Sequence, residues 1–216
     1  DHRDLHSFPT RRSSDLFEVH KQRYEVEVKK PFLDLITRVI SLLQKDEPEI
    51  TMTAKDAMFR LHRDVRFSKD KSPYKTHVSA HISRGGRKDM AEPGLYIEIG
   101  ADKGGLAGGV YMPDKEQLST IRSWIAEHPK EFRSAVTSKA FVQAFGEIRG
   151  DRNKIVPAEF RDAAQQEPLI SLKQFYYWKD LTPAFLASKD LAKKIVDLHN
   201  AAKPVRDVLR AALHAS

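Results

Sequence analysis

Apolar side chains follow a helical period at both ends of the chain and an alternating period in its middle. Between residues 17 and 44 they recur at steps of three and four, as on the buried stripe of an amphipathic helix. The stripe is formed by Phe32, Leu35, Ile36, Val39, Ile40 and Leu43. Pro31 interrupts this run. We therefore expect a kink there, or a second helix with proline in its first turn.

The alternating pattern predicts half-buried strands. Strands are expected at 57–63, 76–83 and 95–99, with a fourth closing at 110–111 and a fifth at 175–178. Because the connections between the first four are short, an antiparallel meander is favoured.

Helix signals dominate the remainder of the chain. Asp114 and Gln117 form a capping box, Pro129 and Ser138 begin two short helices, Ser188 caps another, and Pro204 opens the last. No internal repeat and no linker divides the chain. The predicted fold is a single α+β domain over residues 17–216, a mostly antiparallel sheet of about four to five strands with helices packed on one face.

Residues 1–16 are expected to be non-native. The string from Ser7 to Leu16, SFPTRRSSDL, looks like the translation of a sequencing adapter. We set residues 1–16 aside from fold reasoning for that reason and expect the natural N-terminus to be missing.

Composition narrows the class of protein. With 40% hydrophobic and 31% charged residues the chain is globular rather than disordered. It has no cysteine, which excludes disulfides and fits a reducing cytoplasm, where we expect the protein to act. No apolar run approaches the roughly 18 residues needed to cross a bilayer, so no membrane partner is expected.

The positive charge is concentrated in one segment. Residues 60–88 contain nine Lys and Arg against Asp64 and Asp70, which accounts for the whole formal net charge of +7. Residues 60–75, the basic loop, join two expected strands, so its side chains should hang over one polar face of the sheet. That face would carry Arg60, His62, His77, His81, Tyr96 and Glu98. Guanidinium and ammonium groups there would suit phosphate, carboxylate or sulfate.

We therefore expect the basic loop to bind a small anionic ligand. Phe67 and Tyr74 lie among the charges, which indicates a loop that is folded back and pinned. Asp64 and Asp70 would orient the cations, or act with His62 as acid or base if the protein is an enzyme. The predicted ligand-binding residues are Arg60, Arg63, Arg66, Ser68, Lys69, Lys71, Tyr74 and Lys75.

Three alternatives remain open. An enzyme acting on a phosphorylated small molecule needs a pocket beside His62, Asp64, Asp70 or Glu98. Binding of a nucleic-acid backbone would weaken steeply with salt. A structural or interaction module would expose an apolar patch.

Several motifs are weaker than they first look. His62-Arg63-Asp64 is similar to the kinase catalytic triplet, but Lys69 stands where that motif needs Asn. The glycines between 100 and 109 lack a following Gly-Lys-Ser/Thr, so a strand interpretation is favoured over a phosphate loop. His77 and His81 would lie about 13 Å apart along a strand, too far to share a metal ion, and no metal or cofactor is expected. The aromatic run 175–178 is interpreted as core packing rather than a base-stacking surface.

The string from Phe59 to Thr76, FRLHRDVRFSKDKSPYKT, closely resembles a bacterial and fungal family catalogued as domain of unknown function twenty-four sixty-one. Further matches are FEVHKQRY at 17–24, GLYIEI at 94–99, GGVYMP at 108–113 and LSTIR at 118–122. The resemblance implies a single α+β domain and no established activity. Family members usually have a further helix before the Phe17 position, which agrees with the expected loss of the natural N-terminus.

Overall fold

The computed structural model describes residues 17–215, and a four-stranded antiparallel sheet lies at its centre. The strands lie side by side in chain order, so the predicted meander is confirmed. They are β1 (His77–Ile82), β2 (Gly94–Gly100), β3 (Gly104–Val110) and β4 (Phe175–Leu181). The segment predicted to be non-native, residues 1–16, lies outside the described part.

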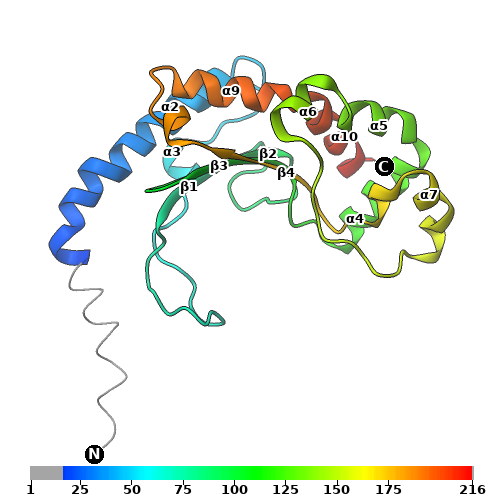
Figure 1. The fold of residues 1–216 in the computed structure, drawn as a ribbon, viewed down its shortest axis with the longest axis horizontal. Helices are drawn as coiled ribbons and strands as arrows, with labels where there is room; N and C mark the ends of the chain where they lie inside the picture. The colour runs from blue at the N-terminus through cyan, green and yellow to red at the C-terminus, as the bar shows by residue number, and fades with distance from the viewer. Residues whose placement is uncertain (1–16, 216) are drawn as a thin grey trace, which may run out of the picture.

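Helices cover one face of this sheet and leave the other to loops. In Figure 1 the helices α2, α6, α9 and α10 lie on one side of the strands, and the basic loop hangs from the opposite side. The predicted α+β fold, with helices packed on one face, is confirmed. The helices are α2 (Lys30–Leu43), α3 (Ala54–Ala57), α4 (Lys115–Glu127), α5 (Pro129–Val136), α6 (Lys139–Phe145), α7 (Arg161–Gln166), α8 (Pro183–Leu186), α9 (Leu191–Ala201) and α10 (Lys203–Leu213), with short 3-10 turns at Ala158–Phe160 and Pro168–Ser171.

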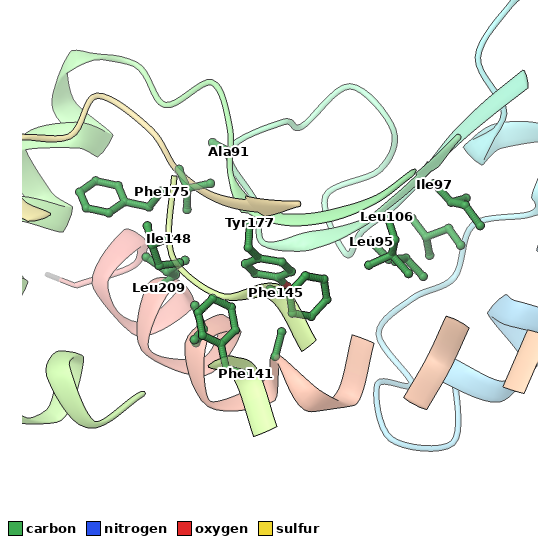
Figure 2. Close-up of a cluster of buried hydrophobic side chains, with 14 of the residues drawn as sticks. Ala91, Leu95, Ile97, Leu106, Phe141, Phe145, Ile148, Phe175, Tyr177 and Leu209 are labelled. Atoms are coloured by element: carbon green, nitrogen blue, oxygen red, sulfur yellow. The ribbon is translucent and has the colours of Figure 1, made fainter. Parts of the chain in front are cut away.

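The strand register explains why only one face is covered. Ala80 pairs with Ile97, and Ile97 pairs with Leu106, so one row of buried apolar side chains crosses three strands. Tyr177 of β4 points to the same side, where its ring centroid lies 5.4 Å from that of Phe141 and 4.6 Å from that of Phe145 (Figure 2). Because side chains alternate along a strand, every neighbouring position faces the other way.

Local signals fix most of the helix boundaries. Asp114 and Gln117 form the predicted capping box at the start of α4. Pro31 lies in the first turn of α2. Immediately before α2, residues Glu25–Lys29 form a π-helical turn, which joins α2 to the helical residues 17–24. Proline lacks the N–H that a continuous α-helix would need there.

Two predicted elements were wrong. Instead of a strand at 57–63, residues 54–57 form α3, capped by Thr53 and Asp56. The chain beyond it makes only isolated bridges, from Met58 to Ala80 of β1 and from His62 to Tyr74 of the basic loop. The capping box is a helical signal that the alternation of Ala57, Phe59 and Leu61 had concealed. The N-cap of α9 is Asp190 rather than Ser188, whose hydroxyl donates to the carbonyl oxygen of Phe185.

A buried ionic cluster holds the C-terminal helices to the body of the protein. Glu47, in the loop after α2, accepts hydrogen bonds from His199 of α9 (3.2 Å) and from Arg206 and Arg210 of α10 (3.1 and 3.2 Å). Glu92, before β2, accepts from Arg210 at 2.8 Å. Burial alone would raise the pKa of Glu47, but His199 and Arg206 outweigh it and hold that pKa well below its usual range. Replacing Glu47 would leave the buried guanidinium of Arg206 without its ion-pair partner.

The ionic cluster predicts a pH-dependent stability. Burial and the neighbouring Arg206 lower the pKa of His199 from 6.5 to about 4. Between those two pH values the unfolded chain binds the proton and the folded protein does not, so stability is lost as the pH falls. The His199 contribution should reach about 3 kcal/mol.

In His199→Gln the side-chain amide can still donate to Glu47 but does not titrate. Denaturant unfolding over this pH range should therefore show a flatter pH dependence for His199→Gln than for the parent protein. His20→Gln, at an exposed histidine, is the matched control and should keep the parent slope. Equal slopes for all three proteins would contradict the assignment.

Candidate functional site

The helix-free face of the sheet is hollow because strand β3 has no bulk there. Its outward positions are Gly105, Ala107 and Gly109, which alternate with buried positions such as Leu106. The strands on either side present large side chains to the same face. A floor of small residues between two walls of large ones forms a depression, here called the sheet-face pocket.

Aromatic rings form the walls of the sheet-face pocket. Ala107 pairs with Tyr96 of β2 on one side and with Trp178 of β4 on the other, and the two ring centroids are 6.4 Å apart. Tyr111 and Tyr176 meet edge to face at 5.5 Å. The cavity has a volume of about 600 Å³, the size range of small-molecule sites.

Trp178 is held in place by Gly105 and Asp180. A Cβ atom at Gly105 would lie 2.0 Å from the indole, so the ring rests directly on the glycine backbone. The indole Nε1 donates to Asp180 Oδ1 at 2.9 Å. The position and orientation of this ring are thus fixed by the sheet rather than by a loop.

Four polar side chains stand in or beside the pocket. Glu98 accepts a hydrogen bond from the Tyr96 hydroxyl at 2.9 Å, and His77 Nε2 lies 3.8 Å from the same carboxylate oxygen. His81 is buried at the edge, with its Nδ1 3.2 Å from the carbonyl oxygen of Arg87. Arg149 lines the far side, where its backbone pairs with Tyr176 beyond the edge of β4.

Burial sets the protonation of two of these groups. It raises the pKa of Tyr96, and the hydrogen bond to Glu98 adds to that rise. Burial also lowers the pKa of His81. Both side chains are therefore neutral at physiological pH. The polar groups of the pocket are an acceptor at Glu98 and a donor at Arg149, with neutral rings between them.

The basic loop is pinned by its own residues. At its base His62 and Tyr74 form a bridge, and the Tyr74 ring stacks on Phe17 with centroids 4.6 Å apart. Nearer the tip Arg63 pairs with Asp70, and Lys71 donates to the carbonyl oxygen of Val65 at 2.9 Å. The predicted pinning of the loop is therefore correct for Tyr74 and wrong for Phe67, whose side chain is exposed.

The tip of the basic loop points into solvent. Phe67 is 96% exposed, and the guanidinium of Arg66 lies 5.9 Å from the centroid of its ring. Arg66 also pairs with Asp64 at 2.6 Å. Ser68 accepts from Arg63 at 3.3 Å. The loop thus presents an apolar side chain on a framework of paired charges.

The candidate acid and base residues lie apart from the sheet-face pocket. Hydrogen bonds from Arg66 lower the pKa of Asp64 to about 2, and those from Ser72 and Arg63 lower the pKa of Asp70. Both carboxylates are exposed, and neither they nor His62 line the pocket. Of the titratable groups considered from the sequence, Glu98 and His81 do line it.

Some Lys and Arg residues of the basic loop take no part in the ion pairs that hold the loop together. Within residues 17–215, Arg60, Lys69 and Lys75 form no ion pair. Lys75 Nζ lies 5.2 Å from the centroid of the Phe59 ring, and Phe59 in turn lies 6.3 Å from Tyr96. Phe59 therefore connects the base of the basic loop to Tyr96, whereas Lys75 lines a separate cavity with Phe17 and Tyr74.

The predicted polar face is correct for the strands and wrong for the segment before them. His77, His81, Tyr96 and Glu98 all lie on the helix-free face, whereas Arg60 and His62 belong to the extended segment outside the sheet. Among the described residues no group of three or more His, Asp or Glu side chains is placed to hold a metal ion.

The sequence interpretation missed the β4 wall of the pocket. The run 175–178 was interpreted as core, but only Phe175 and Tyr177 are buried; Tyr176 and Trp178 face the pocket. The period of two within the run could have shown this division. Arg149 carried no local signal, because its place depends on a long-range bridge.

Fold and site together define an α+β domain with a ligand-sized aromatic pocket on the uncovered face of its sheet. The family model described as "Conserved hypothetical protein (DUF2461)" matches residues 10–207, and the chain belongs to this family. The match begins inside the segment 1–16. No curated protein and no solved structure matches the chain. In residues 17–215 no helix has the length and apolar character that a membrane span requires.

The basic loop yields a prediction about its rigidity. Tyr74→Ala removes the ring that stacks on Phe17 and lies 5.1 Å from the ring of His62, so the loop should open more often. Cleavage by trypsin after its Lys and Arg residues should become several-fold faster, because such a contact contributes about 1 kcal/mol. Phe67→Ala is the matched control: its ring is exposed, so the cleavage rate should stay at the parent value. Equal rates for the two variants would show that Tyr74 does not pin the loop.

Proposed function

We propose that this domain binds a small ligand carrying an anionic group, with the body of the ligand in the sheet-face pocket. The observation that carries the proposal is the pocket itself: about 600 Å³ of space over the small residues of β3, between aromatic walls. Aromatic surfaces with a few placed polar groups are typical of small-molecule sites.

The anionic group is assigned to Arg149. This side chain lines the pocket, and its guanidinium forms no hydrogen bond or ion pair within residues 17–215. Its planar donors match the oxygens of a phosphate or carboxylate. Tyr111 and Tyr176 stand beside it and can add hydroxyl hydrogen bonds.

The basic loop supplies a second part of the proposed function. Arg60, Lys69 and Lys75 remain available to a ligand, while Arg63, Arg66 and Lys71 mainly hold the loop in shape. A cluster of cations beside a pocket raises the local concentration of anions and the rate at which they bind. We assign the free cations to attraction of the ligand, and Ser68 and Tyr74 to holding the loop in shape.

An enzyme acting on a phosphorylated small molecule is the second candidate. The observation in its favour is that Glu98 and His77 lie 3.8 Å apart beside the pocket, where one could exchange a proton with a bound ligand.

Calorimetric titration with phenyl phosphate and phenol tests the binding proposal. Phenyl phosphate should bind saturably, and phenol about tenfold or more weakly, because it lacks the group that Arg149 holds. Arg149→Gln should lower the affinity for phenyl phosphate by about tenfold. Arg161→Gln, at an exposed arginine of α7, is the matched control and should bind like the parent.

Absence of phenyl phosphate binding, or an Arg149→Gln variant that binds as well as the parent, would refute the proposal.

Filling the floor of the pocket gives an independent prediction. Ala107→Leu places a branched side chain on the floor of the pocket, beside the Tyr96 and Trp178 rings, where the ligand would lie. Binding of phenyl phosphate should be lost, while thermal unfolding should change little because Ala107 is outside the helix-covered core. A variant that unfolds like the parent and still binds phenyl phosphate with parent affinity would place the ligand elsewhere.

A further inference from the structure

The two ends of the sheet-face pocket differ in their hydrogen-bonding chemistry. The register places Glu98, Gly105 and Asp180 in one row across the sheet. Tyr176, with Arg149 beside it, lies in a row four residues away, about 13 Å along the strands. One end of the site is therefore acidic and the other basic, with Tyr96 and Trp178 between them.

The acidic end has no donor left for a ligand from its aromatic rings. The Tyr96 hydroxyl donates to Glu98, and the Trp178 indole donates to Asp180, both at 2.9 Å. These bonds leave carboxylate oxygens and ring faces as the groups that a ligand can meet. Such a surface complements a group that is rich in hydrogen-bond donors or positively charged.

Glu98 also lacks a close cation of its own. Among residues 17–215 no cationic group lies within hydrogen-bond distance of this carboxylate. His77 Nε2 is 3.8 Å away, and the Lys75 ammonium lies over the ring of Phe59. A positively charged ligand group at this end would meet a carboxylate that no Lys or Arg contacts, together with the faces of Tyr96 and Trp178. Aromatic rings attract ammonium groups through their quadrupoles.

We propose that the ligand of the sheet-face pocket is zwitterionic, with an ammonium group at the Glu98 end and its anionic group at Arg149. This inference rests on the proposed function and specifies the ligand class: an amine or quaternary ammonium compound that also bears a phosphate or carboxylate. The cavity that Ala107, Gly108 and Gly109 line also has Glu98 and Arg149 among its lining residues, so one space reaches both charged ends.

Phosphocholine and neohexyl phosphate form the test pair. They have the same shape, but a carbon atom in neohexyl phosphate replaces the quaternary nitrogen of phosphocholine. Calorimetric titration of the full chain should give an affinity about tenfold higher for phosphocholine. Glu98→Gln retains an acceptor for Tyr96 and removes the charge, so it should reduce this preference several-fold. Glu116→Gln, at an exposed position of α4, is the matched control and should keep the preference.

Trp178→Leu provides a second variant in case Glu98→Gln fails to fold. It removes the larger of the two aromatic rings at the Glu98 end and should also reduce the preference for phosphocholine. Equal affinity for the two phosphates in the parent protein would overturn the zwitterion inference and leave the proposed function standing. An unchanged preference in Trp178→Leu would likewise overturn the inference. Failure of the parent protein to bind either phosphate would count against both the zwitterion inference and the proposed function.

Discussion

One-sided burial of the four-stranded sheet is the constraint on which the rest of the structure depends. Ala80, Ile97, Leu106 and Tyr177 all point toward the helices, and these side chains are buried together. A shift of one residue in any strand would turn that set outward and bring Tyr96 or Trp178 into the core. The same alternation that buries the core side chains therefore exposes those of the pocket. One strand register thus determines both the stability of the fold and the make-up of the pocket.

The ionic cluster around Glu47 extends this constraint to the C-terminal helices. A buried carboxylate with three hydrogen-bonding partners is costly to disrupt, so α9 and α10 are held in one position over the sheet. The opposite face has no such cover. We propose that its side chains serve a ligand, and that the free cations of the basic loop attract it.

Sequence patterns predicted the fold class, the meander, the Asp114 capping box and the polar strand face that carries Glu98, because each depends on local chemistry or on a period of two. The predicted strand at 57–63 was wrong because the helix cap formed by Thr53 and Asp56 outweighed a short alternation of apolar and polar residues. Trp178 and Arg149 were missed for a different reason. Their role exists only through pairing between β3 and β4 and through the bridge to Tyr176, contacts between residues far apart in the chain.

We propose the helix-free face of the sheet as the ligand site, and the two tryptophans of the chain can test this assignment directly. Trp178 lines the pocket, whereas Trp124 is buried in α4 and stacked on His128. In proton–nitrogen NMR spectra each indole N–H gives its own signal. Titration with phenyl phosphate should move the Trp178 signal saturably and leave that of Trp124 in place. A Trp178 signal that stays unmoved while phenyl phosphate binds would contradict the account.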